Sequence, residues 1–110
     1  MIGTVCVMIR RPKGEEVSTH GIRTAWAMCS SGLEAHVLLV DDGVFNGLDN
    51  PGYNTELMKD FLKEGGRVYC HGKAAEERGL AQEQLLEGIE IIEDDRIAEI
   101  IRETEGTLTF

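Results

Sequence analysis

The chain reads RVYCHGKAA from Arg67 to Ala75, and this stretch decides the fold. Its first four residues form an apolar run, which predicts a buried strand that ends at Cys70. The pair His71-Gly72 breaks the run, and the residues from Lys73 onward predict the start of a short helix. A strand that passes directly into a helix is the repeating unit of layered α/β proteins. The same step brings the Cys70 thiol to an edge of the expected sheet.

The rest of the chain alternates in the same way between apolar runs and helical patterns. Further strands are predicted over residues 2–9, 35–40, 89–92 and 107–110. Helices are predicted after a cap at Ser18 or Thr19, over residues 55–63, and after a cap at Asp94 or Asp95. The core positions of the first and last of these helices are expected at Ile22, Ala25, Trp26, Cys29, Ile97, Ile100 and Ile101. We therefore predict a three-layer α/β fold with a mainly parallel five-stranded sheet and helices on both faces.

Length and composition restrict both the architecture and the partners. A chain of 110 residues forms one domain, over residues 1–110, and its 42% hydrophobic but 5% aromatic content predicts an aliphatic core. Acidic residues outnumber basic ones by 20 to 11, so the formal charge is −9. This charge opposes binding to phosphate backbones, and we expect no nucleic-acid partner.

The cysteines and the N-terminal apolar run suggest a cellular location. Cys6, Cys29 and Cys70 are odd in number and contain no CxxC pair, so neither a disulfide framework nor a zinc site is expected. The run from Ile2 to Ile9 is too short to span a bilayer and has no basic segment before it. We expect a cytoplasmic protein that does not contact the membrane. We expect no metal and no cofactor, since Asp41 and Asp42 are interpreted as turn caps.

Cys70 is the candidate nucleophile. A thiol at a helix N-terminus or beside a cation can have its pKa lowered from ~8.5 to between ~3.5 and ~7.5, and the thiolate is the reactive form. His71 and Lys73 are the candidate neighbours that support this thiolate, whereas Cys6 and Cys29 are expected to be buried. Two plainer interpretations remain open: Cys70 as a packed strand cysteine, and His71 as a solvated turn residue.

Four segments together resemble one family. They are Val40–Asn46, the stretch from Val68 to Leu80 with its Ala74-Ala75 and Arg78-Gly79, Leu85–Ile89, and Thr107–Phe110. In order and spacing they are similar to the DsrE/TusD branch of the DsrE/DsrF family of sulfur-relay proteins. The resemblance covers essentially the whole chain. Two departures are His71-Gly72-Lys73, where TusD-like chains are more apolar, and a shorter loop after Tyr53.

This resemblance implies a flavodoxin-like fold and a sulfurtransferase or carrier role. Cys70 aligns with the cysteine that accepts sulfane sulfur as a persulfide and passes it to a cysteine of another protein. The partners implied are a sulfur donor, a sulfur acceptor, and identical or related subunits in a trimer or hexamer.

Two other functions stay open beside the carrier role. The first is a non-catalytic DsrE-like assembly or small-ligand-binding module in which Cys70 is merely packed. The second is a phosphate or nucleotide binder that uses Arg10, Arg11 and Lys13. However, the sequence RRPKG at residues 10–14 matches neither a Walker A nor a GxGxxG pattern.

Overall fold

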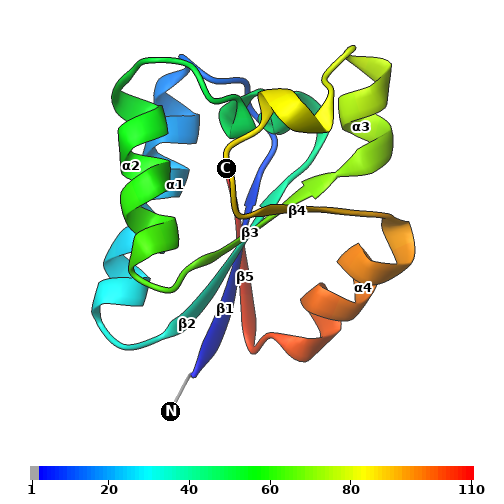
Figure 1. The fold of residues 1–110 in the computed structure, drawn as a ribbon. Coiled ribbons are helices and arrows are strands. Elements are labelled where there is room, and N and C mark those ends of the chain that lie inside the picture. The colour runs from blue at the N-terminus through cyan, green and yellow to red at the C-terminus, as the bar shows by residue number, and fades with distance from the viewer. Residues whose placement is uncertain (1–2) are drawn as a thin grey trace.

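The computed structural model describes residues 3–110, which form a parallel sheet with helices on both faces (Figure 1). The strands are β1 (Thr4–Ile9), β2 (Glu34–Leu39), β3 (Arg67–His71), β4 (Ile89–Ile92) and β5 (Gly106–Thr109). They lie in the order β4-β3-β2-β1-β5, and all neighbouring pairs are parallel. The predicted α/β fold with a five-stranded sheet is confirmed. Ile2, the first residue of the predicted first strand, lies outside the described residues.

The strand order determines which face of the sheet each helix covers. The chain steps from β1 to β4 in one direction, and α1 (Glu16–Ser30) and α2 (Tyr53–Lys63) lie on one face of the sheet. It then returns from β4 to β5 in the other direction, so a right-handed connection places α4 (Asp94–Glu103) on the opposite face (Figure 1). The short α3 (Gly72–Glu77) and the 3₁₀ helices η1 (Asp41–Gly47) and η2 (Gln82–Gln84) belong to connections at the carboxyl end of the strands.

Alternation along the strands produces two cores. The larger one includes Val7, Val37 and Cys70 from the sheet together with Phe61 of α2. The smaller one lies under α4 and comprises Cys6, Leu38, Tyr69, Ile92 and Ile100, with Met8, Val40 and Ile97 packed against it. Because successive strand residues point to opposite faces, Cys70 faces the larger core, whereas Tyr69 and His71 face α4.

Details of the helices differ from the sequence prediction. Helix α1 begins at Glu16 and not after Ser18 or Thr19, because the Ser18 hydroxyl donates to the Glu15 carbonyl at 2.8 Å and does not cap a following helix. Trp26 and Ile101, predicted as core positions, are both exposed. No helix within residues 3–110 is long and apolar enough to cross a membrane.

Candidate functional site

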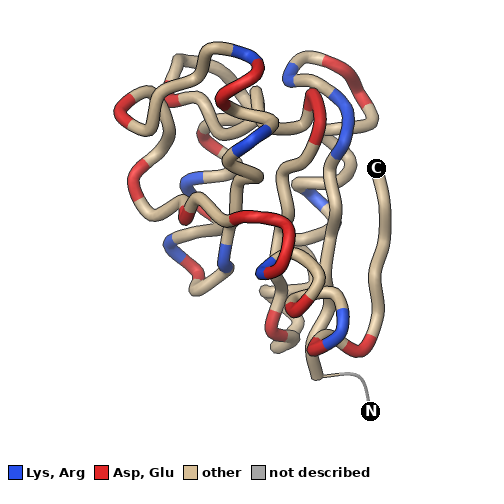
Figure 2. The backbone as a smooth tube through the Cα atoms, turned by 90° about the vertical axis from the view of Figure 1, so that its right-hand side faces the viewer, with Lys and Arg blue, Asp and Glu red and all other residues tan. Residues whose placement is uncertain are grey.

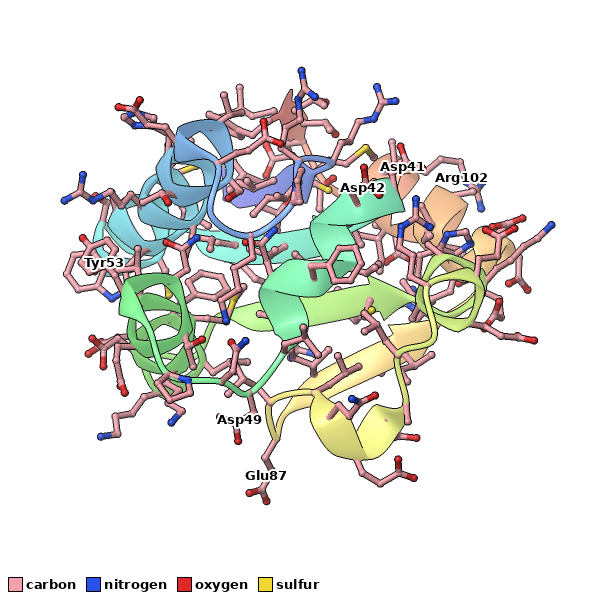
Figure 3. The ribbon with its side chains drawn as sticks, turned by 90° about the horizontal axis from the view of Figure 1, so that it is seen from above. Asp41, Asp42, Asp49, Tyr53, Glu87 and Arg102 are labelled. Carbon is pink, nitrogen blue, oxygen red and sulfur yellow. The ribbon has the colours of Figure 1, made fainter. Side chains whose placement is uncertain are left out.

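Three connections meet at the carboxyl edge of the sheet, as parallel strands require. Arg10, which follows β1, donates from Nε to Oδ2 of Asp41 at 3.0 Å. Arg78, which follows α3, donates from Nε to Oδ1 of Asp42 at 2.9 Å. Figure 3 shows the two aspartates next to each other at the start of η1. Ion pairs therefore tie η1 to both neighbouring connections.

Gly43 allows η1 to lie directly against the end of β1. A Cβ at this position would lie 1.8 Å from the carbonyl oxygen of Ile9, so only glycine permits this approach. Asn46 locks the arrangement, because its Nδ2 donates to the carbonyls of Arg11 and Gly43, both at 3.0 Å. Its Oδ1 is buried and has no hydrogen-bond partner in the part of the chain that the structure describes.

Cys70 lies at the end of β3, but its side chain is 0% exposed. It belongs to the same buried cluster as Val44, Ala74, Ala75 and Leu85, all of them apolar. Burial raises the pKa of the Cys70 thiol from the ordinary 9.0 to about 11. The sequence predicted the opposite, an accessible thiol with a lowered pKa, and that expectation is wrong for this structure. The reason is that strand alternation turns the sulfur toward the core.

The two residues predicted to support a thiolate lie away from the sulfur. His71 faces α4, where its Nε2 lies 2.6 Å from Oδ1 of Asp94. Lys73 is an exposed residue of α3. Within residues 3–110, neither side chain forms a hydrogen bond with the Cys70 thiol, whose closest polar contact is the His71 carbonyl at 3.9 Å. The structure therefore does not bring the three predicted site residues together.

The other two thiols differ from each other. Cys6 is buried as predicted, and burial raises its pKa to about 11, an effect that a hydrogen bond with Thr107 partly offsets. Cys29 is also expected from the sequence to be buried, but it is half-buried in the last turn of α1. Its Sγ lies 3.5 Å from the carbonyl of Glu64. Among the three cysteines, Cys29 is thus the most accessible.

A cavity of about 660 Å³ opens at the same edge of the sheet, beside the N-terminus of α2. It is lined by residues 12–14, by Thr19, and by residues 45, 48 and 50–54. The sequence pattern does not indicate this cavity, because Arg10, Arg11 and Lys13 lie close together in the sequence and suggest a single basic cluster. In the structure Arg10 pairs with Asp41, whereas the Lys13 ammonium donates to the Leu48 carbonyl at 3.2 Å and to Asn50 and Thr55. The signal in the sequence was the glycine at position 52, directly before a helix.

Charges of both signs cover the surface. Along the backbone, Lys and Arg positions are interleaved with Asp and Glu positions (Figure 2). Asp and Glu outnumber Lys and Arg by 20 to 11 in the full sequence, which gives the formal charge of −9. That nucleic acid is not a partner stays a prediction.

Comparison with known proteins identifies the family. The DsrE/DsrF-like family profile matches residues 4–110. The chain belongs to the DsrE/DsrF-like family. Within this fold it resembles the ychN protein of E. coli, whose crystal structure superposes with a TM-score of 0.85 at 26% identity over 100% of both chains. The structure of MTH1491 from Methanobacterium thermoautotrophicum, at 16% identity, shares the fold with a TM-score of 0.82 over 97% of this chain and 98% of that one.

Two archaeal family relatives are similar in sequence over nearly their full length. The uncharacterized protein MK0008 of Methanopyrus kandleri is 27% identical, and the match covers 94% of this chain and 90% of the relative. The uncharacterized protein MJ0989 of Methanocaldococcus jannaschii is 26% identical, with 94% and 96% covered. The names of these two relatives assign no activity to them. The resemblance to a sulfur-relay family that the sequence indicated is thus confirmed at the level of the family.

Proposed function

We propose that this chain is a sulfur carrier that holds sulfane sulfur as a persulfide on Cys70. The observation that carries the proposal is the position of Cys70, next to last in β3 and two residues before α3, in a chain of the DsrE/DsrF-like family. Ligands and reactive groups of open α/β sheets gather at this edge. Membership of a family generally related to sulfur relay supports the same role.

The proposed chemistry is an exchange without net oxidation. The Cys70 thiolate attacks the terminal sulfur of a persulfide on the donor protein, and a new S–S bond forms while that of the donor breaks. The donor cysteine leaves as a thiolate, which restores the charge balance. An acceptor thiolate then attacks the terminal sulfur on Cys70, and Cys70 leaves as a thiolate in turn.

The buried thiol requires an opening step before loading. Only six residues form α3, and its buried residues Ala74 and Ala75 belong to the same cluster as Cys70. An ion pair between Arg78, the residue that directly follows α3, and Asp42 links this helix to η1. We expect a docked donor to displace this short helix, which would expose Cys70 to water and lower the pKa of its thiol from about 11.

The test is a sulfur-loading experiment. After incubation with a persulfide-generating donor, the protein should gain about 32 Da on Cys70, and a reductant should remove this mass. Cys70→Ser should abolish the gain, while the matched control Cys29→Ser should keep it. Persistence of the added sulfur in Cys70→Ser, or no loading of the wild type from a competent donor, would refute the carrier role.

The proposed carrier works in an assembly. We propose a trimer or hexamer of this chain, alone or with related subunits, that meets donor and acceptor proteins in the reducing cytoplasm. The exposed apolar side chains Val17, Trp26, Tyr53, Ile101 and Leu108 supply candidate contact surface. The apolar, glycine-rich loop from Val44 to Tyr53 is the contact surface expected from the sequence; its Tyr53 is exposed, whereas Val44 is buried. Sedimentation that gives only a monomer of 12.2 kDa at micromolar concentration would contradict the assembly.

A second candidate function rests on the burial of the thiol. In a non-catalytic subunit, Cys70 would be a packing residue, as its 0% exposure and its raised pKa favour. The loading experiment separates the two functions, because a packing cysteine takes up no sulfur while the fold stays intact.

A further inference from the structure

The cavity beside α2 presents hydrogen-bond donors at one end. Helix α2 begins after Gly52, whose φ of 152° suits glycine and which offers no side chain to cap the helix. The first amide bonded into the helix is that of Glu56, which donates to the Gly52 carbonyl at 3.2 Å. The preceding amides, from Tyr53 to Thr55, have no acceptor within residues 3–110. The positive end of the helix dipole is therefore uncapped where it borders the cavity.

Asn54 adds a side-chain donor beside the N-terminus of α2. Its side chain lines the cavity and is only 7% exposed. Its Oδ1 accepts a hydrogen bond from the Thr19 hydroxyl at 2.8 Å, which fixes the orientation of the amide group. The Nδ2 group forms no hydrogen bond with another described residue, and it is not among the fully buried atoms, so it can donate into the cavity. A ligand atom in the cavity that accepts this hydrogen bond would satisfy it.

Lys13 places a positive charge at the same end. Its ammonium donates to neutral oxygens of Leu48, Asn50 and Thr55, and no carboxylate lies within 4.0 Å of it in the described part of the chain. The nearest acidic influence is Asp49, which lies 3.9 Å from Lys59. Burial lowers the pKa of Lys13, an effect that the negative charge of Asp49 partly offsets. In a chain with a formal charge of −9, a partly buried cation that forms no ion pair within residues 3–110 favours an anionic ligand.

The walls of the cavity are apolar. Pro12, Phe45, Leu48 and Pro51 surround the space next to the donors. Tyr53 stands at the rim between α2 and α1 (Figure 3), where Arg23 lies over its ring at 5.5 Å. A volume of about 660 Å³ is in the range of small-molecule sites.

We propose that this cavity binds a small organic anion, with its carboxylate or phosphate group at Lys13 and the α2 N-terminus and its apolar body against Phe45 and Leu48. The site is independent of sulfur transfer, because none of its lining residues is Cys70.

The test is a titration followed by ¹⁵N chemical shifts of the amides at residues 53–55. The probes are benzoate and phenyl phosphate, with benzamide as the neutral match of benzoate and inorganic phosphate as the head group without a body. We expect saturable shifts with benzoate or phenyl phosphate, and affinity at least ~10-fold weaker for benzamide and inorganic phosphate, since each lacks one of the two contacts. Which of the two anions binds more tightly identifies the head group.

Two variants and one control locate the site. Lys13→Met should weaken binding by at least ~10-fold, whereas Lys63→Met, the same change at the exposed far end of α2, should leave it unchanged. Asn54→Asp keeps the shape and the Thr19 contact and adds a carboxylate that favours the helix N-terminus, so the fold should persist while binding is lost. Cys70→Ser should bind as the wild type does, which separates this site from the carrier function.

Three results would overturn the proposal. One is binding of benzamide as tight as that of benzoate. Another is full affinity in Lys13→Met or Asn54→Asp. The third is the absence of saturable shifts at residues 53–55 with either anion up to about 10 mM.

Discussion

His71 and Cys70 are consecutive residues that act on opposite sides of the sheet. The His71 imidazole lies 2.6 Å from Asp94 at the start of α4, while the Cys70 thiol is enclosed in the core on the other face. Although His71 follows Cys70 directly in the sequence, its side chain therefore forms a contact between β3 and α4. It links two elements and does not form a catalytic pair with the sulfur.

This separation predicts the behaviour of a histidine variant. His71→Ala should change the alkylation rate of Cys70 by less than about 2-fold, because the imidazole does not contact the thiol. The free energy of unfolding should fall by no more than about 1 kcal/mol, since Asp94 is largely exposed and its ion pair is screened. The measurements are timed iodoacetamide labelling with mass spectrometry, and urea unfolding. A rate loss of an order of magnitude would show that His71 does act on Cys70.

The three thiols should react in the order of their exposure. Cys29 should be alkylated first in the folded protein, because it is half-buried while Cys6 and Cys70 are buried. The sequence alone predicted Cys70 as the fast residue. Peptide mapping after brief labelling at neutral pH checks the order, with Cys29→Ser as the control that should remove the fast phase. Fast labelling of Cys70 would mean that the free protein already opens around α3.

Stability should decline at alkaline pH because of the buried thiols. The pKa of Cys70 is about 11 in the folded protein and near 9.0 when the thiol is exposed, so above pH 9 the unfolded chain loses a proton that the folded chain keeps. The contribution of this thiol to the free energy of unfolding is fully present below pH 9. It falls by about 1.4 kcal/mol per pH unit between pH 9 and pH 11.

Urea unfolding from pH 8 to pH 11 measures this effect. Cys6 should add a similar slope, since its pKa is also about 11. Cys70→Ser removes one of the two thiols and should flatten the decline relative to the wild type, because serine does not titrate in this range. Equal slopes for wild type and variant would contradict the raised pKa of Cys70.

The close approach at Gly43 predicts a large loss of stability. In Gly43→Ala the new Cβ would lie 1.8 Å from the backbone oxygen of Ile9, and neither backbone can move without breaking the contact between η1 and β1. The unfolding free energy should fall by about 3 kcal/mol. Gly106→Ala, at a position with nothing within 4 Å, is the matched control and should change it little. Similar stabilities of the two variants would refute the steric role.

Much of the fold could be predicted because it depends on local patterns. The apolar runs and the helical spacing predicted the five strands that the structure describes. Their parallel direction follows from their alternation with helices. Burial of single side chains was harder to predict. Trp26 fits the spacing of the core stripe of α1, but its actual exposure depends on how α1 turns against α2, which no local pattern encodes.

The site was predictable only in its location. The edge where the loops meet follows from topology, and the position of Cys70 at that edge follows from its strand. The face of the sheet toward which the Cys70 side chain points could not be predicted, because a shift of one residue in a strand reverses the face of every side chain. The cavity was missed for a related reason: Lys13 and Asn54 are far apart in sequence, and only the tertiary fold brings them together.

The place of β5 beside β1 has a consequence for synthesis of the chain. Val5 pairs with Gly106, almost the full length of the chain away. Until the ribosome has released β5, one edge of β1 exposes its backbone donors and acceptors, along a segment, TVCVMI, that is nearly all apolar. Such an open edge is a template for pairing with other nascent chains. The last strand to be made is thus the one that protects the first from aggregation.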